Sequence, residues 1–582
     1  MTFPSRSTVS RASSPARAAG RPWRPSWVDV AVAAAVLVGM YLLLRVGEKA
    51  TVSFDPAHVV KVDTSPAELP YYAARSLLRM FAALAVSVAF ALGYAYAAAH
   101  SRRLERVLIP ALDILQSVPV LGFLTVAVAG FVSLFPGSTP ALECASIFAI
   151  FTSQAWNMAF GFYHSLITLP RELDEVSRSF RFTRWMRFWK VELPAGAIGL
   201  VWNGMMSFGG GWFFLVASEA ISVSGHKQAL PGVGSFAGTA IADGDLGKVG
   251  WAVVTMAVMV VGVNFFFWRP LTAWTERFKN EQSEAADVQR SLVLDFVRRS
   301  SWPALLGRLL RPVAELLGRA GRILGVDDRP LTAGRRRGGD LLFAVVAGGL
   351  IAWGLADLLW YLRDRTGLGV FGEPFLLGLA TLARVVVLVA VATLVWVPIG
   401  VRIGFSPRLA RIAQPVVQVL ASFPANFLFP LATWFFLRTG LPLNVGGMLL
   451  MALGAQWYIL FNTIAGASAI PTDLREAMDD LGVHGRQRWR RLIIPGILPS
   501  FVTGGITASG GAWNASIVSE TVTFGGTTLS ATGLGAYISR ATSDGDYPHL
   551  IAGIAVMAVY VVGLNRLLWR RLYRLAETRY SL

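Results

Sequence analysis

The chain has little of what soluble enzymes and metalloproteins are built from. Its 582 residues include one cysteine and 15% charged residues, whereas soluble domains carry about 25% charged residues. A single cysteine excludes an internal disulfide, and the six histidines are not spaced as metal ligands, so no metal site is predicted. No phosphate-binding loop of the type Gly-x-x-x-x-Gly-Lys-Ser/Thr occurs. We therefore predict no ATP hydrolysis by this chain, no bound cofactor and no catalytic residues.

Long apolar blocks are abundant instead. Hydrophobic residues make up 54% of the chain, and a helix needs about 20 apolar residues to cross the hydrocarbon core of a bilayer. Several blocks reach this length, alone or with their flanks. We predict an all-α membrane protein with about twelve transmembrane helices, at residues 30–44, 80–99, 118–134, 141–162, 195–216, 249–268, 341–362, 385–401, 419–437, 444–464, 497–518 and 550–569.

Positive charge follows a regular pattern along these spans. The formal net charge of +18 would favour a nucleic-acid partner in a soluble protein. Here the arginines gather before the first span and after the second, fourth and sixth spans. The positive-inside rule then places both termini and the basic middle segment in the cytoplasm, with lipid and not nucleic acid as partner. The predicted parts are a basic tail (1–27), a first six-helix domain (28–270), a cytoplasmic linker (271–339) and a second six-helix domain (340–582).

The two halves repeat each other at nearly constant spacing. Trp156 matches Trp457, Ser218-Glu219 matches Ser519-Glu520, and many further pairs share the same offset. An even number of spans gives both copies the same orientation. They should be related by an axis along the membrane normal, with a path at their interface. This pattern does not separate an ATP-driven permease from an ion-gradient-driven secondary transporter with two six-helix halves.

A cytoplasmic segment between the fourth and fifth spans of each half has a common design. Acidic residues, among them Glu175 and Glu476, come early, where they complement a helix dipole. Basic residues follow, and Pro194 and Pro495 mark the return to the membrane. Gly482 permits a helix end and a chain reversal in the second copy. We predict a short helix that lies across the cytoplasmic surface and is exposed for docking.

This segment resembles the EAA loop of permeases from binding-protein-dependent ABC importers. The second copy matches closely, with Glu476, Ala477 and Gly482. The first departs from the pattern, because Val176-Ser177 replaces the alanines and Arg181 stands at the glycine position. In that family the loop forms the coupling helix that sits in a groove of the ATPase subunit. The resemblance implies the same role for both segments, with a modified docking site in the first half.

Further motifs resemble nitrate/sulfonate/taurine-type permeases, namely Gly510-Gly511-Ala512-Trp513-Asn514 and Thr532-Gly533-Leu534-Gly535. The resemblance implies a type I ABC importer permease with two permease domains fused in one chain, multi-pass in a bacterial inner membrane. It implies a translocation path for a small solute, such as the anions nitrate, sulfonate or taurine. The implied partners are two copies of an ABC ATPase subunit, which bind ATP and Mg, and a periplasmic or lipid-anchored solute-binding protein. Alternatives are the secondary transporter and a scaffold protein without transport.

Five residues are candidates for the path or its gate, each with a structural alternative. Trp212 and Trp513 line the path or pack between helices. Glu219 and Glu520 form an outer gate, contact the binding protein, or are helix-end carboxylates wetted by the interface. Asn514 follows a glycine-containing stretch, where we expect the backbone to unwind beside a cavity.

Two arginines near the outer ends of the second and eighth predicted spans also occupy matching positions. Arg79 and Arg384 either attract anions or extend along the helix to the membrane interface.

Overall fold

A computed structural model describes residues 62–117, 127, 130–131, 133–134, 139–180, 182–223, 226–275, 348–349, 352–524 and 527–579. The basic tail, the predicted span 30–44, most of the span 118–134 and most of the linker lie outside these residues. The described parts of both halves are almost entirely helical, with two short β-hairpins. This confirms the all-α membrane fold.

The first half is built from helices that follow the apolar blocks. Its elements are η1 (Pro66–Glu68), α2 (Leu69–His100), α3 (Arg102–Ser117), α5 (Thr139–Ile167), α6 (Arg171–Ser179), α7 (Arg184–Arg187), η2 (Phe188–Glu192), α8 (Leu193–Glu219), β1 (Ala220–Val223), β2 (His226–Ala229), α9 (Val233–Ala242), α10 (Leu246–Val263), η3 (Asn264–Trp268) and α11 (Arg269–Thr275).

The second half repeats this order. Its elements are η5 (Leu368–Phe371), α15 (Gly372–Gly404), α16 (Pro407–Ser422), η6 (Ala425–Leu428), α17 (Phe429–Thr439), α18 (Leu443–Ala469), α19 (Thr472–Asp480), α20 (Gly485–Arg488), η7 (Trp489–Ile493), α21 (Ile494–Ser519), β3 (Thr521–Phe524), β4 (Thr527–Ser530), α22 (Leu534–Asp544), α23 (Tyr547–Leu564), η8 (Asn565–Trp569) and α24 (Arg570–Arg579). The strands pair antiparallel within each hairpin, β1 with β2 and β3 with β4.

Seven helices in the described residues are long and apolar enough to cross a membrane, or eight if one bent pair counts as a span. The bent pair corrects the straight span expected at 419–437. The helix from Pro407 to Ser422 and the one from Ala425 to Thr439 meet at an angle of 77°. Pro424 explains the break, because proline disfavours a helical conformation at Phe423 and has no N–H to donate. The total of twelve stays a prediction.

Small residues let the helices of each half pack closely. The indole of Trp268 lies over Gly204 on α8, 3.4 Å from the place where a Cβ would be. Trp569 lies over Gly505 on α21 in the same way, at 2.1 Å, which no larger residue could accept. Such approaches are typical of membrane helices, where close packing replaces the hydrophobic effect between helices. Two large buried hydrophobic clusters surround the long helices. One is built mainly from the first half, and the other joins second-half residues to Leu142, Ala145, Ala149 and Leu230 of the first half.

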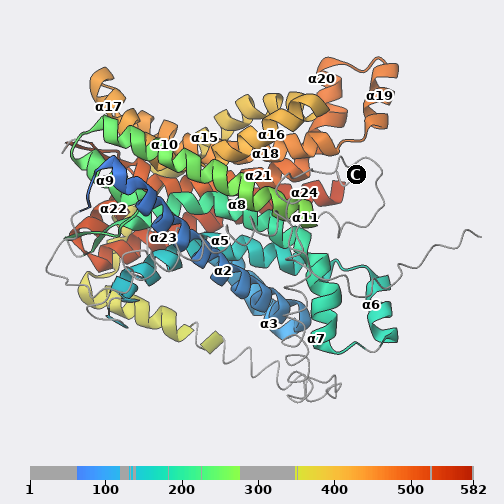
Figure 1. Cartoon of the computed structure of the whole chain (residues 1–582), viewed down its shortest axis with the longest axis horizontal. Helices are drawn as coiled ribbons and strands as arrows, with labels where there is room; N and C mark the ends of the chain where they lie inside the picture. The colour runs from blue at the N-terminus through green and yellow to red at the C-terminus, as the bar shows by residue number, and fades with distance from the viewer. Residues whose placement is uncertain are drawn as a thin grey trace, which may run out of the picture.

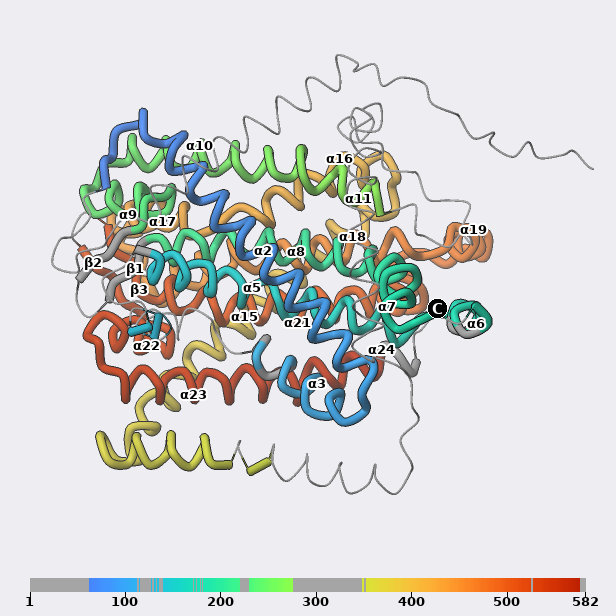
Figure 2. Tube along the Cα trace, turned by 60° about the horizontal axis from the view of Figure 1, so that its bottom comes forward, coloured from blue at the N-terminus to red at the C-terminus, as the bar shows by residue number. Residues whose placement is uncertain are grey.

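The two ends of the molecule differ in character. Figures 1 and 2 show α6 and α19 at one end of the long axis, with α7, α20 and α24 near them. The hairpins and the short helices α9 and α22 lie at the opposite end. The segments that resemble EAA loops thus project from one face of the helical body, and the hairpins from the other.

Candidate translocation path and coupling loops

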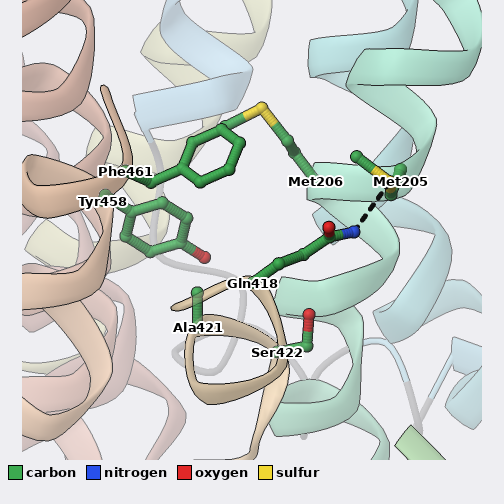
Figure 3. A pocket seen from close by; sticks show the side chains of 7 residues that line it. All are labelled: Met205, Met206, Gln418, Ala421, Ser422, Tyr458 and Phe461. Atoms are coloured by element: carbon green, nitrogen blue, oxygen red, sulfur yellow. Dashed lines mark hydrogen bonds between the residues drawn. The ribbon is translucent and has the colours of Figure 1, made fainter. Parts of the chain in front are cut away.

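A small cavity lies between the two halves. It is bordered by α8 of the first half and by α16 and α18 of the second (Figure 3). Its volume of about 30 Å³ is near the size of one water molecule. The cavity is lined by Met205, Met206, Gln418, Ala421, Ser422, Tyr458 and Phe461.

The break in the bent helix pair borders this cavity. Ser422 is the last residue of α16 and faces α8, where a Cβ on Gly209 would come within 2.6 Å of the Ser422 Oγ. A side chain at position 209 would require the Ser422 hydroxyl to move, so glycine favours this close approach of the two helices. Interrupted helices at an interface between repeats are a recurring feature of solute sites in transporters. The break therefore makes this cavity a candidate for part of the path.

The cavity carries polar groups and no charge on its seven lining residues. The Gln418 Nε2 donates to the Asn264 Oδ1 at 3.1 Å and lies 2.8 Å from the Met205 Sδ. The Tyr458 hydroxyl and the Ser422 hydroxyl supply further donors. Such a lining can donate hydrogen bonds to a small polar or anionic solute. It has no carboxylate that would bind a cation.

The two candidate tryptophans lie elsewhere. Trp212 and Trp513 are each 1% exposed. The Trp212 ring meets Phe208 edge to face at a centroid distance of 5.5 Å, and Trp513 stacks on Tyr560 at 6.0 Å. Neither tryptophan lines the cavity, and both pack inside large buried hydrophobic clusters. A role in the path in another conformation stays a prediction.

The expected unwinding before Asn514 is wrong. The helix α21 runs unbroken from Ile494 to Ser519, through the glycines of this stretch. The Asn514 Nδ2 donates to the carbonyl of Gly510 one turn earlier, at 3.2 Å, which supports the helical backbone. Asn203 and Asn462 make the same bond within their own helices. These amides satisfy themselves locally, so they do not require an opened backbone.

Glu219 is fully buried at the hairpin end of the first half, with 0% of its side chain exposed. Arg79 on α2 pairs with it at 2.6 Å, and the Ser76 hydroxyl donates to the same oxygen at 2.6 Å. Its other oxygen accepts from the backbone N–H of Gly234 at 2.7 Å. The alternative of a wetted carboxylate is therefore wrong for this residue. Its donors come from α2 and α9, which enclose it.

Glu520 has a matching environment in the second half and is also 0% exposed. Arg384 pairs with it at 2.7 Å and Thr381 donates to it at 2.9 Å. The N–H of Gly535 donates to its second oxygen at 2.8 Å. The two arginines thus neither extend to the interface nor stand free to attract anions, because each is paired with a buried carboxylate.

We call the cytoplasmic segments around α6 and α19 the first and second coupling loops. In the second, the chain reverses direction after the helix, as the sequence indicates. Gly482 adopts a left-handed conformation with φ +64° directly after α19. Its N–H donates to the carbonyl of Asp479 at 3.0 Å, and the N–H of Val483 donates to that of Met478 at 2.8 Å. This pair of bonds is a Schellman motif, in which a left-handed residue ends the helix.

The first coupling loop makes an equivalent bond around α6. The N–H of Phe182 donates to the carbonyl of Ser177 at 2.9 Å, the position that matches Val483 and Met478. Arg181 itself lies outside the described residues. The first loop therefore forms the hydrogen bond that ends its helix, although its sequence differs from the family pattern.

Both coupling helices present apolar side chains to solvent at matching positions. Phe180 is 72% exposed and Leu481 76% exposed. Leu173 and Leu474 are exposed one helix length earlier in their loops. Glu175, Glu476 and Ala477 are exposed as well. Large apolar side chains exposed at a helix end are typical of a surface that a partner covers.

The two loops are anchored to the membrane helices by different chemistry. In the first half the buried Glu192 accepts from Arg187 at 2.8 Å and lies 3.1 Å from His100 at the end of α2. In the second half the matching position is the buried, apolar Ile493, which belongs to an apolar cluster. Each anchor is the last residue of a π-helical segment, η2 or η7, and lies two residues before Pro194 or Pro495.

Together, the fold and the site define a polytopic helical membrane protein with a path between two halves and a pair of helices presented at one end. The family model for the inner membrane component of binding-protein-dependent transport systems matches the chain twice, over residues 89–269 and 396–581. The two matches cover more than half of the chain. The chain belongs to this family, and its two halves are two copies of the family's membrane component.

Relatives with functional names agree with this assignment. A putative ABC transporter permease of Methanocaldococcus jannaschii is 27% identical over 215 residues, which cover 36% of this chain and 75% of the relative. A nitrate import permease of Leptolyngbya laminosa is 27% identical over 213 residues, 37% of this chain and 71% of its own. The taurine transport permease of Escherichia coli is 26% identical over 197 residues, 33% and 68% respectively. These relatives are transport subunits and not enzymes.

The sequence did not single out every residue of the site. Ser422 and Pro424 drew attention only as repeat matches to Ser117 and Pro119. The proline inside an apolar stretch was the signal for the break. Gln418, one turn before Ser422, carried no signal that distinguishes it from other amides in membrane helices.

Proposed function

We propose that the chain is the transmembrane permease subunit of an ATP-driven importer, in which the two halves together form the path for a small solute. The observation that carries this proposal is the pair of exposed coupling helices, α6 and α19, at one end of a body whose halves meet around a cavity. A path between halves and two docking helices on one face fit a machine that moves one half against the other.

Each coupling helix docks one copy of an ABC ATPase subunit, so the transporter contains two ATPase copies per chain. ATP and Mg bind to the ATPase subunits and not to this chain. The exposed Phe180 and Leu481 would enter the ATPase surface together with Glu175 and Glu476. Apolar anchors ringed by polar groups are typical of such contacts. This face, both termini and the linker are then cytoplasmic.

The hairpin face is then external and receives a periplasmic or lipid-anchored solute-binding protein. The solute carries a small anionic group, as do nitrate, taurine and bicarbonate, which the names of relatives give as cargo. The neutral donors of the cavity support this choice, since Gln418, Ser422 and Tyr458 can hydrogen-bond an anion.

The proposal is tested in proteoliposomes that contain the chain and its partner ATPase, with the solute-binding protein outside. Labelled nitrate, taurine and bicarbonate are the probes. We expect uptake of one of them that requires both ATP and Mg on the ATPase side and the binding protein on the other. Uptake that follows an imposed ion gradient without ATP would contradict the proposal and favour a secondary transporter.

A further inference from the structure

Two buried clusters of charged and polar groups occupy matching places at the hairpin end of the two halves. Each centres on the glutamate that ends the long helix before the hairpin, Glu219 of α8 or Glu520 after α21. The matching members are Arg79 with Arg384, Ser76 with Thr381, Glu143 with Asn444, Gly234 with Gly535, and Pro231 with Thr532.

The clusters tie the base of each hairpin to the neighbouring long helix. Arg79 pairs with Glu219 and also donates to the carbonyl of Pro231 at 3.0 Å, just beyond strand β2. The backbone N–H of Leu230 donates to the carbonyl of Glu219 at 3.1 Å. The two ends of the hairpin therefore lie side by side, and the Arg79 guanidinium of α2 holds both of them.

The second cluster repeats this arrangement with equivalent groups. Arg384 donates to the carbonyl of Thr532 at 2.8 Å, and the N–H of Ala531 donates to the carbonyl of Glu520 at 2.8 Å. The glycine before each short helix is packed against the carboxylate. A Cβ on Gly232 or on Gly533 would lie 2.2 Å from a carboxylate atom of Glu219 or Glu520.

The clusters differ in one charge pair. The first cluster has a second arginine, Arg75, which pairs with Glu143, and Glu143 also accepts from Arg79 at 2.5 Å. At the matching positions the second half has Ala380 and Asn444, and Arg384 donates to the Asn444 Oδ1 at 2.9 Å. Among the described residues, the first cluster holds two arginines and two glutamates and the second holds one of each, so the charges balance in both. A buried charge without its partner is strongly unfavourable, so a neutral pair is gained or lost together.

We propose that these clusters are positioning clamps for the external hairpins, and that what each clamp requires is charge balance and not a fixed number of charges. This inference rests on the proposed function, because the hairpins are taken as the face that receives the binding protein. We expect that Arg75 and Glu143 can be replaced together without loss of the clamp, because the second half has Ala380 and Asn444 at the matching positions. Arg79 and Arg384 are the positioning residues proper, since they reach both the glutamate and the chain beyond the hairpin.

The test uses proteoliposomes with the full chain, its ATPase and its binding protein. Basal ATP hydrolysis and its stimulation by the binding protein are both measured. The variants are Arg75→Ala, Glu143→Asn and the double change that copies the second half. We expect each single change to lower stimulation by about tenfold while basal hydrolysis stays within about twofold. The double change should restore stimulation to within about twofold of the unaltered chain.

Arg75→Lys is the control that keeps the charge, and we expect it to keep stimulation. If the Arg75→Ala protein does not insert into the membrane, Arg75→Lys and Glu143→Asn still test the inference. The inference is overturned if the double change is no better than the worse single change, or if Arg75→Lys is as damaging as Arg75→Ala. It is also overturned if basal and stimulated hydrolysis fall in parallel, as a purely structural defect would produce. If the unaltered chain shows no stimulation at all, the proposed function fails with it.

Discussion

At the scale of single residues, buried polar groups in this chain find partners that the sequence cannot pair in advance. The repeat pointed to Glu219 and Glu520 as special, and to Arg79 and Arg384 as matching arginines. It did not join them, because Arg79 and Glu219 are 140 residues apart and meet only after α2 packs beside α8. Locally encoded features were easier to predict, such as the reversal at Gly482, which depends on one φ angle.

The close packing over Gly232 gives a prediction about the effect of adding one Cβ atom at this position. Its φ of −177° is open to any residue, so only the buried Glu219 carboxylate forbids a side chain. Gly232→Ala should lower the yield of folded, detergent-extracted protein several-fold, since displacing a buried ion pair costs about 3 kcal/mol or more. Gly250→Ala on α10, where nothing lies within 4 Å, is the matched control and should fold normally. Equal yields of both variants would contradict the packing described here.

The cavity gives a prediction about charge. Gln418→Glu places a carboxylate beside Ser422 and Tyr458 and should reduce anion uptake by about tenfold or more, equal to about 1.4 kcal/mol. Gln456→Glu is the control, because Gln456 lies outside the cavity and only accepts a bond from Trp396 at 3.0 Å. Uptake is compared at equal amounts of assembled transporter. An unchanged rate in Gln418→Glu would remove this cavity from the path.

At the scale of elements, hydropathy predicted the positions of the helices well, but it did not predict where a helix is interrupted. The span at 419–437 became two helices at 77°, because hydropathy sums apolar residues and does not register that Pro424 ends a helix. The opposite error occurred at α21, where glycines suggested unwinding and the helix runs on. The short helices α6 and α19 were predicted because prolines precede them and mark the return to the membrane in both halves, and a glycine ends the second.

The second coupling loop gives the prediction at this scale. Gly482→Val should release the ATPase or uncouple it from transport, because valine in a left-handed conformation costs about 1–2 kcal/mol or more. Gly482→Asn should be tolerated, since asparagine visits this conformation readily. Glu476→Lys should uncouple as well, and more strongly than Glu175→Lys in the modified first loop. Co-purification of the ATPase and solute uptake are measured for each variant. Loss in Gly482→Asn equal to that in Gly482→Val would show that φ is not the cause.

At the scale of the whole molecule, the duplicated unit sets orientation and assembly. Both coupling helices and α24 lie at one end (Figure 2), so the termini of the two halves face the same way. We predict that both chain termini and the 271–339 linker are cytoplasmic. Reporter domains that are active only in the cytoplasm should be active when fused at the linker or after α24. Reporters that are active only in the periplasm should be inactive at the same positions. A reporter in the linker that is active on the periplasmic side would contradict this orientation.

The central claim is that one chain replaces a pair of permease subunits, with one ATPase subunit on each half. Native mass spectrometry of the transporter, purified through a tag on this chain, tests it most directly. The account predicts one copy of the chain with two copies of the ATPase, and loss of one ATPase copy when Gly482→Val disables the second loop. An intact transporter that contains two copies of this chain would contradict the account.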